Sequence, residues 1–225
     1  LYRLALHRRP ANYKAPKHQT TTTGIGLSTG EKSYVAPRIP GRGITRDQRK
    51  RLSGLQLDMR QRMRRGWPTG ARETLDSEAH RGLASNTQFD SYQARIAWSY
   101  YLYNKDGLAY ELAAASAERS RNYVPDADWT AGLAAWRLGQ LEQAVRHFAI
   151  LAVSTKASRW LVSAGAYWAA RSELKLRRPE HVSHWLALAA RDPRTFYGLL
   201  ATRALGTKPA LNWSASTLTR AHLTT

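Results

Sequence analysis

Glu180, His181 and His184 form the densest group of residues that could do acid–base or metal chemistry. A helix would place the two imidazoles on one face, because residues three positions apart are neighbours on a helix surface. A zinc site takes three or four ligands at fixed distances, and the sequence offers no third partner of defined spacing. We therefore interpret the two as surface histidines and predict no metal ligand and no cofactor.

The sequence lacks the patterns of common nucleophilic and phosphate-binding enzymes. It contains no cysteine, and no serine lies in a recognisable nucleophile elbow with a histidine and an acid to complete a hydrolase site. No glycine-rich loop follows a strand pattern, as a phosphate-binding loop requires. These patterns therefore identify no catalytic residue.

Positive charge is the dominant chemical feature of the chain. The formal net charge is +19, and the first 66 residues hold 16 of the 35 Lys and Arg residues against three acidic ones. This balance indicates an anionic partner. The candidate polyanion-binding residues lie on one predicted helix and are Arg46, Arg49, Lys50, Arg51, Arg60, Arg62, Arg64 and Arg65. The alternative is an ordinary solvated face on a helix that packs against its neighbour.

The helix that carries these cations has clear boundaries in the sequence. Thr45 followed three residues later by Gln48 is a capping-box pattern, and the run 66–68 (GWP) stops the helix. Its apolar face consists of Leu52, Leu55, Met59 and Met63. Upstream, residues 1–44 are rich in Arg, Lys, Thr, Gly and Pro and show no helical period, so we predict an extended basic arm.

Further helices are predicted downstream from residue 69. Asn86 is the expected cap of a helix that ends at a turn over residues 104–107, where a second helix begins. Asp128 is the expected cap of the helix that follows the loop 121–128. The spacing of apolar residues along these segments indicates antiparallel helical hairpins.

A tight turn at Leu138 and Gly139 separates two helices that are predicted to approach closely. Small Gly132 and Ala135 on the first helix meet bulky Phe148 on the second. This arrangement of small and bulky residues is similar to that of a tetratricopeptide unit.

The last helices repeat this design in a less regular form. One is expected to begin at Pro179, and another is expected to be capped by Asp192 and to start at Pro193. In the latter, the residues predicted to face inward are Phe196, Leu199 and Leu200. The spacing also predicts that Trp136, Trp160, Trp168 and Trp185 lie in the core and that Trp67 and Trp213 lie on the surface.

Together these patterns predict an all-α protein, namely a degenerate tetratricopeptide-like superhelix of antiparallel helical hairpins with an irregular basic N-terminal arm. We divide the chain into a basic extended arm (1–44), an N-terminal helical region (45–125), a tetratricopeptide-like module (126–206) and a linker (207–225). No stretch reaches the roughly 18 consecutive apolar residues of a membrane span.

Two runs of sequence resemble a known family. These are AWRLGQLEQAVRHF (135–148) and the stretch 164–206, which contains YWAAR (167–171) and RTFYGLLATRALG (194–206). They are similar to the helical superhelix that precedes the catalytic domain in soluble lytic transglycosylases, bacterial enzymes that cleave peptidoglycan glycan strands. The resemblance covers about the last half of the chain.

The catalytic motif of that family does not occur in this sequence. The family presents its general acid in a Glu-Ser pair followed by a Gly-Leu-Met-Gln stretch, and neither is present. A catalytic carboxylic acid is the minimum equipment for this cleavage. The resemblance therefore implies that the parent protein is an enzyme whose catalytic domain is not in this chain, and that residues 207–225 lead toward that domain.

The resemblance implies a non-catalytic, substrate-orienting part of a periplasmic enzyme in the bacterial envelope, with peptidoglycan or another anionic envelope polymer as partner. Because the numbering opens at Leu1, we expect a targeting segment upstream. One alternative is a tetratricopeptide-like scaffold that is not an enzyme and docks with other envelope proteins. A basic helical protein that binds nucleic acid is a further alternative, which rests on charge alone.

Overall fold

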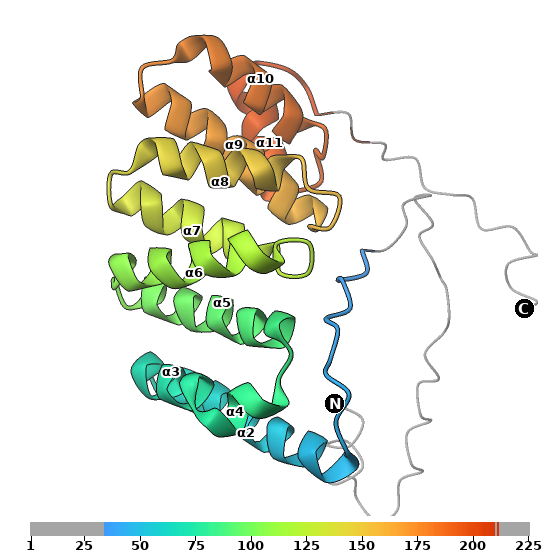
Figure 1. Ribbon diagram of the computed structural model, residues 1–225. Helices are drawn as coiled ribbons and strands as arrows, with labels where there is room; N and C mark the ends of the chain where they lie inside the picture. Colours follow the sequence, from blue (N-terminus) through green and yellow to red (C-terminus); the bar gives the residue numbers. More distant parts are fainter. Residues whose placement is uncertain (1–33, 210, 212–225) are drawn as a thin grey trace, which may run out of the picture. The chain divides into compact units, whose positions relative to one another are not determined.

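The computed structural model describes residues 34–209 and 211, and these residues form ten α-helices and no β-strand. This confirms the prediction of an all-α protein, while residues 1–33 of the expected arm and most of the expected linker lie outside the described residues. The helices carry the labels of Figure 1: α2 Arg46–Arg64, α3 Pro68–Asp76, α4 Glu78–Leu83, α5 Asn86–Leu102, α6 Asp106–Ser120, α7 Asp126–Arg137, α8 Leu141–Ala152, α9 Arg159–Lys175, α10 Pro179–Ala190 and α11 Phe196–Ala204.

From α5 onward, helices that follow one another in the chain pack against one another (Figure 1). Contacts link α5 to α6 and continue in order to α10, while α11 turns back and contacts both α9 and α10. The connections between them are short, as expected for antiparallel neighbours. None of the described helices is long and apolar enough to cross a bilayer.

The first described helix begins and ends as its sequence predicts. The Thr45 hydroxyl accepts a hydrogen bond from the backbone of Gln48, whose side chain accepts one from the backbone of Thr45. This capping box satisfies two backbone donors at the helix start. After α2, Gly66 adopts a positive φ of 78°, a conformation that glycine adopts readily, and the helix ends there.

Two helices are capped by a residue next to or near the predicted one. α5 is capped by Ser85 and not by Asn86, and α11 is capped by Thr195 and not by Asp192. In both cases a hydroxyl accepts a hydrogen bond from the backbone N–H of the third helical residue. Several cap-forming residues stand close together at each site, so that local sequence does not choose between them.

Asp128 does not cap α7 as predicted, because the helix begins at Asp126. The Asp128 side chain is buried, with its carboxylate 2.8 Å from His147 Nδ1 on α8 and 3.3 Å from Arg121 Nε. Burial of a carboxylate requires such partners. Asp128 therefore links α7 to its neighbours and does not serve as a cap.

The close approach predicted between the helices that carry Gly132 and Phe148 is confirmed. Phe148 on α8 is fully buried, and a Cβ atom added at Gly132 on α7 would lie 2.5 Å from its ring. A Cβ atom at Gly165 on α9 would lie 2.9 Å from the carbonyl oxygen of the same phenylalanine. Glycine on both sides therefore allows α8 to pack tightly between α7 and α9.

The predicted core positions of tryptophan are correct in part. Trp160 is 60% exposed, contrary to the prediction, and Trp67 is 51% exposed, as predicted. Trp213 lies outside the described residues. The partly buried tryptophans that pack around Phe148 are Trp129, Trp136, Trp168 and Trp185.

The predicted inward face of α11 is wrong for two of its three residues, while the third, Leu200, is half-buried. Phe196 is 59% exposed and Leu199 is 43% exposed. The helix instead buries its small residues Gly198, Ala201 and Thr202. A Cβ atom at Gly198 would collide with the Asp192 carbonyl, so the chain passes too close for bulky residues on this side.

Candidate binding surfaces

The cations predicted to bind a polyanion lie on different sides of α2. Leu52 and Met59 are buried and define the inner side of the helix. Six of the cations are exposed and form no ion pair with another residue that the structure describes; Arg64 lines a groove beside the helix, and the other five are Arg46, Arg49, Lys50, Arg51 and Arg65. We call these five residues the outer cations of α2.

The remaining three cations of α2 face other parts of the structure. Arg62 Nε lies 2.7 Å from the Asp58 carboxylate, and its guanidinium lies 4.8 Å from the centre of the Trp67 ring. These contacts tie the end of α2 to the start of α3. Arg60 and Arg64 line a groove that begins beside the helix.

One wall of that groove is a segment without helix or strand, residues 34–44, which we call the strap. Figure 1 shows it running alongside the stacked helices before the chain enters α2. Tyr34 donates a hydrogen bond from its hydroxyl to the Lys156 carbonyl at 3.1 Å, and the Ser85 hydroxyl donates one to the Pro40 carbonyl at 2.6 Å. The strap is thus held at two places far apart in the helical stack.

The strap groove is the space of about 630 Å³ between the strap, α2, α5, the α6–α7 loop and the start of α7. Its volume falls within the range of about 300–1,000 Å³ that is typical of ligand sites. Its apolar and aromatic lining consists of Tyr34, Ala36, Pro37, Ile39, Met63, Ala94, Trp98, Leu102, Tyr123, Val124, Pro125 and Trp129. Its charged residues are Arg60, Arg64, Arg95 and Asp126.

Asp126 is the single acidic residue among the described residues of the groove lining. Asp126 is exposed, but the surrounding residues partly desolvate its carboxyl group, and this desolvation raises its pKa. The positive charge of Arg95 acts in the opposite direction. Burial and the nearby Asp126 also raise the pKa of the Tyr34 hydroxyl. The acid, the arginine and the end of the strap therefore influence one another across the groove.

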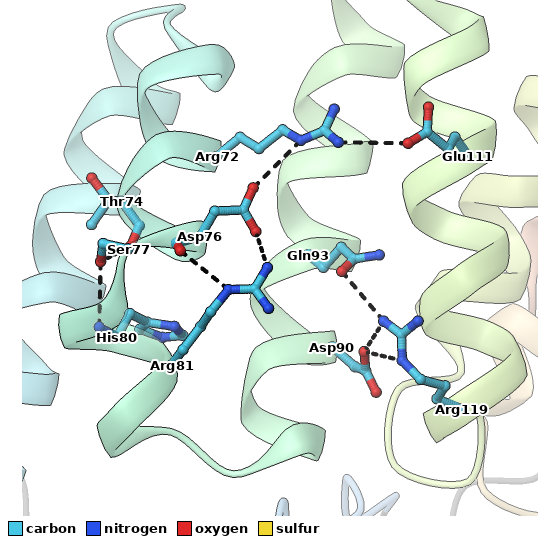
Figure 2. Close-up of polar contacts among 10 residues, drawn as sticks. All are labelled: Arg72, Thr74, Asp76, Ser77, His80, Arg81, Asp90, Gln93, Glu111 and Arg119. Atoms are coloured by element: carbon cyan, nitrogen blue, oxygen red, sulfur yellow. Dashed lines mark hydrogen bonds and ion pairs between the residues drawn. The ribbon is translucent and has the colours of Figure 1, made fainter.

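A second hollow of about 530 Å³ is bordered by α3, α5 and α6 and differs in chemistry (Figure 2). Arg72 lies 3.7 Å from Asp76 and 3.5 Å from Glu111, and Arg81 lies 2.7 Å from Asp76. These pairs are partly exposed, and such pairs contribute little to stability. They nevertheless neutralise the charges of this hollow among themselves.

The deepest charge in this second hollow is also fully engaged. Asp90 is 1% exposed, and its carboxylate accepts hydrogen bonds from Arg119 on α6 and from the Ser120 hydroxyl, both at 2.5 Å (Figure 2 shows the Arg119 contact). Arg119 also donates to Gln93 at 3.3 Å. This network joins α5 to α6 and leaves no unpaired charge for a ligand. We therefore regard the hollow as structural.

His80 on the short helix α4 is the described histidine with the most unusual surroundings. It is fully buried, both ring nitrogens lack a hydrogen-bond partner among the described residues, and its ring lies 6.3 Å from those of Phe89 and Tyr92. Burial lowers its pKa and the neighbouring Arg81 also lowers it, and together they outweigh the opposite effects of the Leu75 backbone and of Asp76. His80 is therefore neutral in the folded protein at pH 7.

His181 and His184, which were predicted to be surface residues, lie exposed on α10. His181 Nδ1 is 3.4 Å from Glu173, a buried residue of α9, while His184 packs against the Trp185 ring at 5.0 Å. No group of three or more potential metal ligands is found within the described residues. The structure thus brings His181 to a carboxylate that the sequence did not suggest.

The strap groove was not predicted from the sequence. The expected arm of residues 1–44 contributes the wall over 34–39, and Arg60 and Arg64 come from the predicted polyanion face. Met63 comes from the predicted apolar face of α2. The other lining residues lie on α5, in the α6–α7 loop and on α7, where their spacing indicated only helices or a connecting loop. The position of Asp126 before an apolar helix was a local signal, but it is equally typical of a helix start.

Comparisons with protein-family models, with curated proteins and with solved structures found no match to this chain. A proposal for its function therefore rests on the sequence and on the surfaces of the structure.

Proposed function

We propose that this chain is a non-catalytic helical module that binds peptidoglycan, or another anionic polymer of the bacterial envelope, and orients it for the catalytic domain of a periplasmic lytic transglycosylase. The observation that carries the proposal is the exposed charge of the outer cations of α2, which have no acidic partner among the described residues. Unpaired surface cations of this kind attract an anionic polymer and raise its local concentration.

The resemblance of the second half of the chain supports the choice of polymer. The motif YWAAR (167–171) lies within α9, and RTFYGLLATRALG (194–206) spans α11. A tetratricopeptide-like superhelix forms part of the same proposal. The tight packing of Phe148 against Gly132 between α7 and α8 supports it, because small residues that let paired helices approach are typical of such repeats.

Under this proposal the chain by itself leaves glycan strands intact. No glutamate occurs in the Glu-Ser pair of the family, and cleavage of a glycosidic bond requires a positioned carboxylic acid. The cleavage chemistry is assigned to the domain that the resemblance implies in the parent protein.

A pelleting experiment with purified sacculi tests the proposal. We expect the full chain to pellet with sacculi at about 0.1 M salt and to be released toward about 1 M, because the screening length falls from about 10 Å to about 3 Å. A triple variant with Arg46→Gln, Arg49→Gln and Lys50→Gln should be released at lower salt. The matched control is Arg146→Gln, Arg203→Gln and Lys208→Gln, which removes the same charge from other exposed positions.

Three results would contradict the proposal. Pelleting that does not respond to salt would show that charge does not govern binding. Equal loss of binding in the two triple variants would show that net charge acts without regard to α2. Release of anhydro-muropeptides into the soluble fraction, detected by mass spectrometry, would show that the chain itself cleaves glycan.

A scaffold that docks with other envelope proteins is the second candidate function. The observation in its favour is the strap groove, whose mostly apolar lining is suited to protein side chains. The two functions involve largely different surfaces of the module, so one chain can perform both.

A further inference from the structure

We infer that the strap groove is a docking site for an acidic, apolar peptide segment of a partner protein. The inference goes beyond polymer binding at the outer cations of α2, because it concerns different side chains and a different class of ligand. It rests on the lining of the groove, on the charges of the groove and on the strap.

The lining of the groove selects a ligand with an apolar body. Trp98, Leu102 and Tyr123 are 37%, 59% and 44% exposed, so large apolar surfaces face the open space. Covering such side chains with apolar groups of a ligand is favourable. The Trp98 ring is held by stacking on Tyr101 at 5.3 Å, which gives the ligand a preformed flat surface.

The charges of the groove select a ligand that is also acidic. Arg60 and Arg64 line it from α2, and Arg95 lines it from α5. Against these three cations stands one acid, Asp126. The described charged residues of the groove therefore leave a net positive charge. Arginine binds carboxylates through paired hydrogen bonds, so acidic side chains of a ligand can bind along the edges of the groove.

The strap shows that these helices accommodate an extended peptide. Residues 34–40 of the chain itself lie between the Lys156 carbonyl and Ser85, held by hydrogen bonds at Tyr34 and Pro40. Pro37 and Ile39 of the strap are half-buried. A partner segment lying beside the strap would therefore find both a neighbouring peptide and the apolar side chains of α5 and the α6–α7 loop.

The same features argue against a bare glycan as the occupant of the groove. No Asn or Gln side chain is among the described lining residues, Asp126 is the one carboxylate there, and the hydroxyl residues Ser91, Ser99 and Thr130 are buried. A sugar buries many hydroxyl groups, and each buried hydroxyl without a hydrogen bond costs free energy. A peptide with apolar side chains carries far fewer such groups, so it matches the lining better.

The test begins with a phage-displayed random dodecapeptide library selected on the immobilised full chain. We expect the enriched sequences to combine acidic residues with apolar ones. A synthetic, fluorescently labelled copy of the most enriched sequence is then titrated with the soluble chain by fluorescence polarisation. Two groove variants are compared with wild type, one with Arg64→Gln and Arg95→Gln and one with Leu102→Glu.

Each groove variant has a matched control. The arginine pair is matched by Arg146→Gln with Arg203→Gln, and Leu102→Glu is matched by Leu174→Glu, since the two leucines are 59% and 60% exposed. We expect each groove variant to raise the Kd about tenfold, or about 1.4 kcal/mol, while the controls stay near wild type. Thermal denaturation followed by circular dichroism verifies that every variant remains folded.

Several outcomes would overturn the inference. One is that no sequence is enriched, and another is that the enriched sequences are neutral or basic. Equal binding by groove variants and controls would place the peptide elsewhere on the chain. Tighter groove-dependent binding by dodecanoate or by oligothymidylate than by any selected peptide would assign the groove to a lipid or to a nucleic acid.

Discussion

The packing of Phe148 against Gly132 leads to a prediction in which one substitution changes sign with its background. Phe148 on α8 is fully buried, and a Cβ atom at Gly132 would lie 2.5 Å from its ring, closer than carbon atoms can approach. We expect Gly132→Ala alone to destabilise the protein by about 1–2 kcal/mol. This is the cost of overpacking a filled site, reduced by the better helix propensity of alanine.

Removing the ring should reverse the effect. Phe148→Ala alone should cost about 3–5 kcal/mol, because it leaves a cavity between α7, α8 and α9. In that background, Gly132→Ala places its methyl group in vacated space and gains about 0.5–1 kcal/mol from helix propensity. The two changes should therefore show a coupling energy of about 1.5–3 kcal/mol in a double-mutant cycle.

Gly54→Ala serves as the matched control for the cycle. Gly54 lies within α2, and a Cβ atom there would meet no atom within 4 Å. This substitution should stabilise the protein by about 0.5–1 kcal/mol with or without Phe148. The difference from Gly132 then isolates the contact with the ring from helix propensity.

The unfolding free energies are measured by urea denaturation followed by far-ultraviolet circular dichroism. The proteins compared are the wild type, Gly132→Ala, Phe148→Ala, their double variant, and Gly54→Ala alone and combined with Phe148→Ala. Equal denaturant slopes would show that the denatured state is unchanged. If Gly132→Ala stabilises the wild type as much as Gly54→Ala does, then α7 and α8 do not approach as closely as described. A coupling energy near zero would refute the same point.

The remaining predictions concern His80 and the start of α5. Because burial lowers the pKa of His80, its contribution to folding is present above the unfolded value of 6.5 and is lost as the pH falls below it. His80→Leu should therefore make the unfolding free energy depend less on pH between about pH 7.5 and about pH 5.5. An unchanged pH dependence would contradict the burial of His80. Ser85→Ala should lower the unfolding free energy by about 1 kcal/mol because it removes the cap of α5, whereas Asn86→Ala should change it by less than about 0.5 kcal/mol. Equal effects of the two substitutions in urea denaturation would show that Ser85 is not the cap.

The elements of the fold were predictable because their signals are local. The capping box of Thr45 and Gln48, the turn at Gly139 and the proline start of α10 act through neighbouring backbone atoms. The small and bulky residues that bring α7 and α8 together also stand in adjacent segments. Local backbone chemistry therefore determined where most helices lie and which neighbours pair.

The choice between neighbouring polar residues was beyond the reach of the sequence. Ser85 and Asn86 are both good caps, and Asp128 became a buried partner of His147 once α8 packed beside it. The prediction that Phe196 and Leu199 of α11 face inward was wrong because packing between segments decides which side of this helix is buried. Its apolar spacing does not show that the chain near Asp192 approaches Gly198 too closely to admit large side chains.

By itself the sequence determined an all-α chain with its described helices in nearly the right places, and a strongly basic first third in which eight of the 16 Lys and Arg residues lie on or directly after α2. Tertiary structure alone decided that Arg60 and Arg64 should meet Arg95, Asp126 and the strap around one groove. The physical reason is that helix periodicity and capping act over a few residues. A groove, in contrast, is formed by side chains from segments far apart in the chain, whose meeting depends on how the helices stack.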